Sequence, residues 1–276
     1  MNQPQVCDAF VRISRGVWRW MQRAQRVQNP SLQKRALPWG MTLRETTLTD
    51  YVVLRLLEEC APAVSVFTFP PALEAQTGAD MELWITDRRS WLGLRIQCKV
   101  LAPDGHFHEL HYQRNGQYQT EQLIQAAQVV PGCQPVYLLY IGPTSCGHLW
   151  WDCGRCCWPP VYPIPRCFPA TWGNWWLSAY SVQALRPATD LPSLSRWIVP
   201  WHCMVCCPIR PSLEVGGIGN WLRETVFSRD DSRVEPVGQP PRYVSLAMNN
   251  QLPQAWEELH QLLEGRLVRH LTLLNV

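Results

Sequence analysis

Residues 74–101 read EAQTGADMELWITDRRSWLGLRIQCKVL, and this stretch decides the fold that we expect. It holds two runs rich in apolar and β-branched residues, at Met81–Thr86 and at 91–101, separated by the polar segment 87–90. Such runs on either side of a short polar turn are typical of two strands that pair as a hairpin. We therefore take this hairpin as the reference for placing the side chains around it.

The polar residues of the hairpin fall at regular positions. Gln97 and Lys99 are two residues apart, so their side chains project from the same face of the second strand. Asp80 opens the first strand, and Glu82 lies two residues further on the same face. Pairing of the strands would bring a carboxylate, a carboxamide oxygen and an ammonium group together at one end of the sheet.

This grouping suits metal-dependent hydrolysis of a phosphodiester. Mg²⁺ prefers carboxylate and carbonyl oxygens, and it can polarise a phosphate and help to ionise a water molecule. A nearby lysine can orient or deprotonate that water, whereas an arginine does not deprotonate. The 25 basic residues include only two lysines, Lys34 and Lys99. We expect Lys34 to be a surface charge, and Lys99 stands where this chemistry needs a lysine.

Helices are predicted on both sides of the hairpin. Residues 7–28 have the spacing of an amphipathic helix, and a second helix is expected at 48–60, where Thr47 and Asp50 form an N-capping pattern. A short strand at 65–69, a helix at 119–130 and a buried strand at 135–141 complete the pattern. This order, helix, strand, strand, strand, helix, strand, predicts an α/β sandwich with a mixed sheet.

The rest of the chain divides by composition. Eight of the twelve cysteines and eight of the fifteen tryptophans lie between about 142 and 212, where we expect an irregular elaboration packed on the sheet. Beyond it we expect a strand at 243–247, a helix at 255–264 and a last strand at 267–276. The predicted organisation is a helical extension at 1–40, a core at 41–142, the elaboration at 143–212 and an α/β segment at 213–276 that completes the domain.

Composition narrows the class of protein. Hydrophobic residues make up 46% of the chain and charged residues 17%, which supplies a core and excludes a wholly disordered protein. We see no secretory signal and no apolar run that would span a membrane, so we expect a cytoplasmic protein whose cysteines stay reduced or bind metal. A net charge of +3 argues against tight non-specific binding of nucleic acid by the chain alone.

Two cysteine pairs offer a metal site of a different kind. Cys153 and Cys156, together with Cys203 and Cys206, could form a tetrahedral Zn²⁺ site that stabilises the structure. The 46 residues between the pairs exceed the spacing of about 15–20 found in compact zinc ribbons. The alternative is that these cysteines are thiols in a core of cysteine and tryptophan.

The first helix carries a row of arginines, for which two readings stay open. Their spacing of three or four residues would let them contact phosphates, or would simply give the helix a solvated face. We expect the interleaved Trp18 and Trp20 to anchor the core rather than to stack on bases. The arginines are residues 12, 15, 19, 23 and 26.

The hairpin motif resembles that of a known group of enzymes. Gly78-Ala79-Asp80 followed by Ile96-Gln97-Cys98-Lys99 is similar to the D…QxK variant of the PD-(D/E)XK restriction-endonuclease-like superfamily, found in Mrr-type restriction nucleases. With the runs RETTLT at 44–49 and QTEQLI at 119–124, the chain also resembles a bacterial domain family of unknown function placed in that superfamily. The resemblance covers about two thirds of the chain, with specific motifs at 44–124.

The resemblance implies an αβββαβ core, a Mg²⁺ or Mn²⁺ ion and a nucleic acid substrate, DNA before RNA. By position, Asp80 corresponds to the invariant metal ligand, Gln97 to a ligand that is usually a carboxylate, and Lys99 to the catalytic lysine. Glu45 corresponds to the acid of the first core helix, and Gln119 to a polar residue of the following helix. The implied function is a metal-dependent nuclease, such as the effector of a bacterial restriction or anti-phage system.

Glutamine at position 97 departs from the usual pattern and lowers the negative charge available to a metal. Glu74 and Glu82 are candidates to supply a substitute carboxylate. Two alternatives to an active nuclease follow. One is a non-catalytic subunit that keeps the fold and binds nucleic acid or assembles with a protein partner. The other is an interaction module stabilised by zinc. An active enzyme could equally need a protein partner or a second copy to deliver or restrain its activity.

Overall fold

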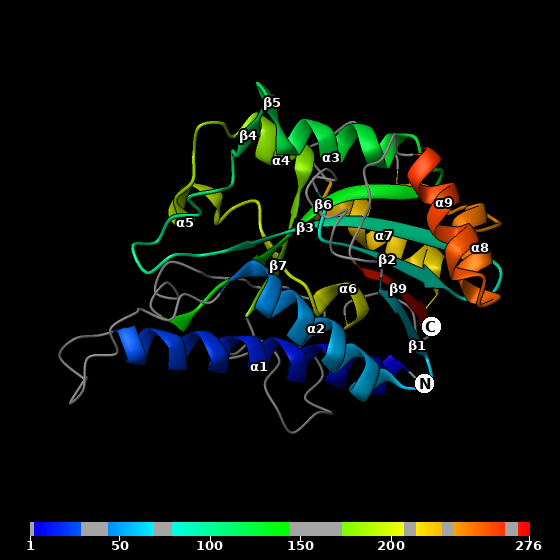
Figure 1. Ribbon diagram of the computed structural model, residues 1–276. Coiled ribbons are helices and arrows are strands. Elements are labelled where there is room, and N and C mark those ends of the chain that lie inside the picture. The colour runs from blue at the N-terminus through cyan, green and yellow to red at the C-terminus, as the bar shows by residue number, and fades with distance from the viewer. Residues whose placement is uncertain are drawn as a thin grey trace.

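A mixed β-sheet runs through the molecule and carries helices on both faces (Figure 1). The computed structural model describes residues 3–28, 44–68, 79–143, 173–206, 214–227, 234–262 and 270–276. Within these residues the sheet has seven strands in the order β1-β9-β2-β3-β6-β7-β8. The strands are β1 (Val64–Thr68), β2 (Met81–Thr86), β3 (Trp91–Val100), β6 (Cys133–Tyr140), β7 (Asn174–Ser178), β8 (Val199–Pro200) and β9 (His270–Asn275). A two-stranded hairpin of β4 (Gln113–Arg114) and β5 (Gln117–Tyr118) stands apart from it.

The predicted hairpin is confirmed in its strands and in its register. β2 and β3 pair antiparallel, with Met81 opposite Ile96 and Glu82 opposite Arg95. β6 then lies parallel to β3, and the crossover connection that a parallel pair needs contains a helix. The polar residues of β3 face one layer of helices, while Ile96 and Cys98 point into the core on the other side.

Two layers of helices enclose the sheet, and each layer buries its own core. One face is covered by α1 (Gln3–Gln28), α2 (Glu45–Cys60), α6 (Cys203–Cys206) and α7 (Val215–Thr225). The other is covered by α3 (Gln119–Gln128), α4 (Ala179–Ala184), α5 (Leu191–Leu194), α8 (Arg242–Met248) and α9 (Leu252–Leu262). The α/β class and the order α2, β1, β2, β3, α3, β6 agree with the prediction.

Three predictions about local structure were wrong. Helix α2 begins at Glu45, before the expected cap, so Arg44 is its N-cap residue and no side chain caps it. Residues 173–206 are regular rather than irregular, and β7 and β8 extend the main sheet. The expected strand at 243–247 is helix α8, because its buried residues Tyr243, Val244 and Ala247 follow the helical period. The segment 144–172 lies outside the described residues.

The last strand of the described chain lies inside the sheet, next to the edge strand β1. β9 lies between β1, to which it is antiparallel, and β2, to which it is parallel. A strand was expected in this part of the sequence, but its neighbours were not. The candidate site therefore rests on a strand, β2, that has its hairpin partner β3 on one edge and the distant strand β9 on the other.

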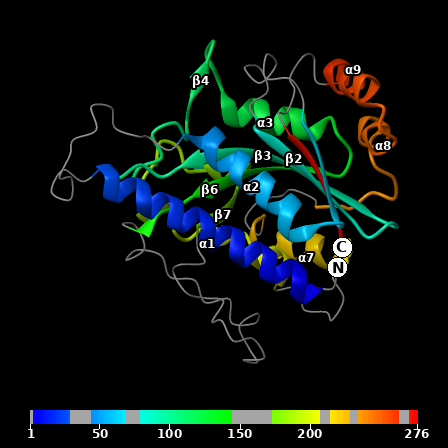
Figure 2. The ribbon, with the colours of Figure 1, turned by 60° about the horizontal axis from the view of Figure 1, so that its bottom comes forward.

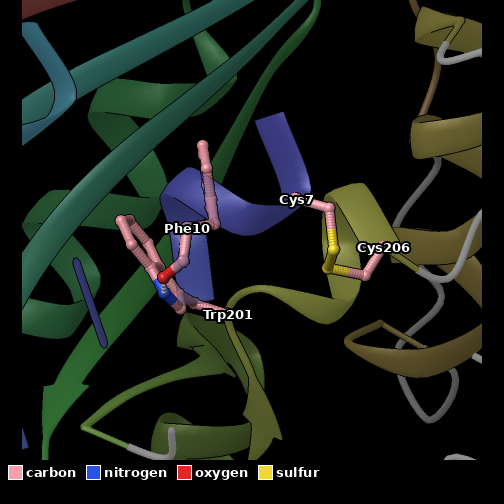
Figure 3. Close-up of a disulfide and its surroundings, with 4 residues drawn as sticks. All are labelled: Cys7, Phe10, Trp201 and Cys206. Carbon is pink, nitrogen blue, oxygen red and sulfur yellow. Dashed lines mark hydrogen bonds between the residues drawn. A yellow bond between two sulfur atoms is a disulfide. The ribbon is translucent and has the colours of Figure 1, made fainter. Parts of the chain in front are cut away.

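A disulfide fastens the N-terminal helix to the far part of the chain (Figure 3). Cys7 of α1 is bonded to Cys206 of α6. Nearby, the Trp201 indole N–H donates to the Phe10 carbonyl at 3.0 Å, and the two rings stack with centroids 4.4 Å apart. The expectation that the cysteines remain thiols or bind metal was thus wrong for Cys7 and Cys206.

The two tryptophans of α1 have different surroundings. Trp18 is buried, as predicted, but the side chain of Trp20 is 42% exposed, so the prediction that it anchors the core was wrong. Among the described helices, including α1, none is both long enough and apolar enough to span a bilayer.

Candidate active site

Asp80 and Gln97 meet at the end of the hairpin. The Asp80 N–H donates to the Ile96 carbonyl at 2.8 Å, which holds the residue against β3 just before β2 begins. Oδ2 of Asp80 then accepts from Nε2 of Gln97 at 2.7 Å and from the backbone N–H of Cys98 at 2.6 Å. The aspartate is therefore fixed by the strand beside it, with one polar side chain in direct contact.

Gln119 extends this contact to a helix. The residue opens α3, and its Nε2 donates to Oε1 of Gln97 at 2.9 Å. The next residue, Thr120, hydrogen-bonds the hydroxyl of Tyr137 at 2.9 Å, which ties the start of α3 to β6. Oε1 of Gln119 is buried and has no hydrogen-bond partner among the described residues. A buried acceptor without a partner costs free energy of folding, so this oxygen is available to accept a hydrogen bond.

Lys99 and Glu45 form the second half of the site. The Lys99 side chain is only 3% exposed, and its Nζ lies 3.4 Å from Oε2 of Glu45 and 4.0 Å from Oε2 of Glu109. Glu45 is the first residue of α2, one turn before Thr49, whose hydroxyl lies 3.1 Å from that of Tyr140 on β6. This contact positions the start of α2 over the end of the sheet.

The surroundings of Glu45 perturb its carboxyl group. Burial raises its pKa to about 7, and the charges of Asp80 and Glu109 act in the same direction, while Lys99 opposes them. The influence of Asp80 on this pKa means that the two acids lie within electrostatic reach of each other. Two carboxyl groups that repel each other in a partly buried place form a favourable setting for a cation.

A cavity of about 480 Å³ opens beside these residues. Glu45, Lys99 and Glu109 supply part of its polar lining, and Leu101 and Phe107 part of its apolar lining. Its remaining wall comes from the last turns of α1, the start of α2 and the segment after β3: Met21, Ala24, Arg44, Thr46, Val100, Ala102, Pro103 and His108. A ligand in the cavity would touch the lysine and the raised-pKa carboxyl together.

The donor set fits a hard divalent cation in its chemistry. Asp80 and Glu45 offer carboxylate oxygens, and Gln97 offers a carbonyl oxygen, which are the ligand types of Mg²⁺. In this arrangement the Gln97 amide presents its nitrogen to Asp80 and its oxygen to Gln119. A half-turn of both amides would direct the Gln97 oxygen toward Asp80 and satisfy the buried Gln119 oxygen. No group of three or more His, Cys, Asp and Glu side chains is placed to bind a metal in the described parts of the chain.

Family comparison covers nearly the whole chain, because the family of unknown function DUF6615 matches residues 6–275. The chain belongs to that family. No curated protein and no solved structure matches the chain. The interpretation of the site therefore rests on its geometry.

This member of the family brings together five of the residues predicted from sequence. Asp80, Gln97 and Gln119 form one chain of hydrogen bonds, and Lys99 with Glu45 forms an ion pair beside it. Glu109 was missed, because it lies in the segment between β3 and β4, where no periodic pattern predicts which side chains return to the sheet. Thr49 was also missed, although its spacing of four residues from Glu45 placed it on the same side of the helix.

Glu82 is a correction. Its carboxylate forms an ion pair with Arg95, and both side chains are 0% exposed. The indole N–H of Trp84 and the hydroxyl of Tyr243 also donate to it, at 3.1 and 2.7 Å. Glu82 is therefore committed to a sealed cluster and is not free to substitute as a metal ligand. Glu74, the other candidate, lies outside the described residues.

The zinc site predicted from the cysteine pairs is not assembled in the described part of the chain. The sulfur of Cys206 is bonded to Cys7, so it cannot act as a thiolate ligand in this state. Cys203 is a buried free thiol. Cys153 and Cys156 lie outside the described residues.

Proposed function

We propose that this protein is a metal-dependent nuclease that hydrolyses phosphodiester bonds, with Asp80, Gln97, Lys99 and Glu45 as its active site. The observation that carries the proposal is the placement of these side chains at one end of the β2–β3 hairpin, where Gln97 donates to Asp80, and Lys99 pairs with Glu45 in the lining of a cavity. We further propose that α2, β1, β2, β3, α3 and β6 are a PD-(D/E)XK-type αβββαβ core, with β9 inserted between the first two strands.

In this mechanism each residue has a separate task. Asp80 and Glu45 would hold Mg²⁺ or Mn²⁺ through their carboxylates, and the Gln97 carbonyl oxygen is a further candidate ligand. The bound cation would polarise the scissile phosphate and make a neighbouring water easier to ionise. Lys99, held by Glu45 at the cavity, orients the attacking water and stabilises the negative charge that develops on the phosphate.

Nucleic acid is the proposed substrate, with DNA as the first to be tested. The net charge of +3 is too small to hold a long polyanion tightly by charge alone, so a protein partner or a second copy would help to deliver it. A role as effector of a bacterial restriction or anti-phage system follows by analogy of fold.

A non-catalytic subunit that binds nucleic acid is the second candidate, and a specific observation favours it. The Gln97 amide already satisfies Asp80 without any metal, and Lys99 is already paired with Glu45. A site with two carboxylates satisfied in this way would keep its shape after losing its activity. Cleavage, rather than binding, separates the two candidates.

The decisive experiment compares cleavage by purified variants in Mg²⁺ and in Mn²⁺, on single- and double-stranded DNA and RNA. We expect Asp80→Asn and Lys99→Arg each to reduce the rate at least about 100-fold. The matched controls are Glu257→Gln and Arg114→Lys, which make the same kinds of change at exposed positions on α9 and β4. Equal cleavage rates for the wild type and the four variants would contradict the active-site assignment. Binding without cleavage by the wild type would favour the second candidate.

A further inference from the structure

Helices α1 and α2 lie side by side across one face of the sheet (Figure 2). Their outer surface carries large apolar side chains that are exposed to solvent. Trp20 of α1 is 42% exposed, and Leu54 of α2 is 53% exposed. The partly buried Tyr51, one turn before Leu54 on α2, has its ring centroid 6.1 Å from that of Trp20. Large apolar side chains gathered at one place on a surface mark a binding site more often than isolated ones do.

The aromatic pair is seated by the shape of α1. Tyr51 crosses α1 at Gly16, one turn before Trp20, and a methyl group at Gly16 would overlap its hydroxyl. The glycine thus allows the tyrosine to lie against the helix and to flank the indole of Trp20. Packing on one side leaves the other part of the indole open to solvent.

Some of the positive charges near this pair have no ion-pair partner among the described residues. From residue 9 to residue 28, α1 contains five arginines and no acidic residue. Arg12 is paired with Glu59, and Arg55 of α2 with Glu58 and Glu59, so these charges are balanced. Arg19 and Arg23 are exposed, and neither forms an ion pair with any described residue. Two guanidinium groups without an ion-pair partner in the described part of the chain therefore lie near the indole on the same helix.

The surface leads directly to the candidate active site. Met21 and Ala24, the next residues of α1 on the inner side of Trp20 and Arg23, line the cavity that also holds Glu45 and Lys99. Arg44, the N-cap of α2, is exposed and lines the same cavity. The cavity that contains Lys99 is therefore lined by residues of the same two helices that carry Trp20 and Tyr51.

We propose that Trp20, Tyr51, Arg19 and Arg23 form a docking surface for single-stranded nucleic acid, here called the α1–α2 ridge, which feeds the strand into the cavity. Arginines hold the phosphates, and the exposed indole stacks on an unpaired base. This pairing of an aromatic platform with a basic track is how sequence-independent proteins bind single strands. The inference rests on the proposed function for its ligand and adds to it that the strand must be unpaired.

The charge selects this occupant over a second copy of the chain. A copy would present the same uncompensated arginines to the ridge, and like charges at an interface oppose association. A duplex hides the faces of its bases, so it would use the arginines but not the indole. Each alternative therefore has its own signature in a binding experiment.

The test measures binding by fluorescence anisotropy, with labelled dT30, labelled rU30 and a labelled DNA duplex, in EDTA so that nothing is cleaved. We expect the wild type to bind both single strands about tenfold more tightly than the duplex. Trp20→Ala should weaken single-strand binding about tenfold and Trp20→Phe much less, because a smaller aromatic ring still stacks. Arg19→Gln with Arg23→Gln should reduce the slope of log K against log salt by about 1.4, the value for two phosphate contacts.

The control is Arg88→Gln with Arg89→Gln, which removes the same charge at the β2–β3 turn, the end of the hairpin away from Asp80. This variant should bind like the wild type. Three results would each overturn the proposed binding surface. They are equal binding by the ridge and control variants, a preference for the duplex, and a dimer that Trp20→Ala dissociates. Cleavage that depends on Asp80 would survive those results. Binding that depends on Trp20, without cleavage, would support the ridge and reject the nuclease.

Discussion

Two neighbouring pairs of residues on the same face of the β2–β3 hairpin have different surroundings. Glu82 and Arg95 face each other across the strands and are sealed from water. Asp80 and Gln97, one position further toward the strand end on that face, lie beside Lys99 and its cavity. Both pairs are polar and both are predictable from strand alternation. What separates them is the layer above, because Tyr243 of α8 donates to Glu82, whereas Asp80 stays partly exposed and the neighbouring Lys99 pairs with the start of α2.

The choice of cation follows the same division. Arginine occupies the sealed position. Burial lowers the pKa of Arg95, but Glu82, Cys133 and Tyr243 together raise it by more, so the pKa lies further above its ordinary value. Lysine occupies the position beside the cavity, where a compact ammonium can approach a ligand. In a chain with only two lysines, this contrast between neighbouring positions is informative.

The strongest way to break the comparison is to remove one half of the sealed pair. We expect Arg95→Met to lower the free energy of unfolding by about 3–5 kcal/mol, because it leaves the Glu82 carboxylate buried without its partner. Denaturant unfolding followed by circular dichroism measures this. The double variant Arg95→Met with Glu82→Leu should recover much of the loss. A loss below about 1 kcal/mol in the single variant would contradict the structural role.

At the second pair, Asp80 and Gln97, an added negative charge should strengthen the binding of a metal ion. Gln97→Glu adds a third carboxylate, so we expect Mn²⁺ to bind about tenfold more tightly by calorimetry. In EDTA the same variant should unfold more easily than the wild type, because two adjacent carboxylates repel each other. Gln113→Glu on β4 is the matched control, since it adds the same charge at an exposed position. Unchanged Mn²⁺ affinity in Gln97→Glu would argue against this position as a ligand.

The smallest effect is expected at the other end of the hairpin. Asp87 accepts hydrogen bonds from the backbone N–H groups of Arg89, Ser90 and Val215. Burial raises its pKa and these bonds lower it, with a net lowering. Its stabilising contribution is therefore present above the pKa of the unfolded chain and is lost as the pH falls through the lower folded value.

Asp87→Ala should accordingly cost about 0.5–1 kcal/mol at pH 7, the range of a solvent-screened hydrogen-bonded turn. The difference from the wild type should shrink as the pH falls below about 4. Urea unfolding at the two pH values measures both numbers. A difference that stays constant with pH would mean that the alanine acts by some other route than the lost carboxylate.

The sequence predicted those parts of the fold and site that depend on local period. Strand alternation placed Gln97 and Lys99 on one face and gave the hairpin its register, and helical spacing identified α1 and α3. The position of β9 could not be predicted, because nothing in a short apolar strand specifies its neighbours. The role of Glu82 was misjudged for a related reason: alternation gives the face of a side chain, while Tyr243, 161 residues away, decides whether water reaches it. The prediction for Trp20 was wrong because the residue lies at the edge of the apolar face of α1, where the sequence does not show whether a side chain is buried or exposed.

The position of β9 between β1 and β2 has a consequence for the timing of synthesis. The ribosome makes the hairpin that carries Asp80 and Lys99 long before it makes His270–Asn275. Until β9 emerges, β1 and β2 each have an unpaired edge, and β1 is not joined to the rest of the sheet. A nascent chain would thus hold every proposed catalytic residue without the scaffold that aligns them, so activity would arise only after β9 has been added to the sheet.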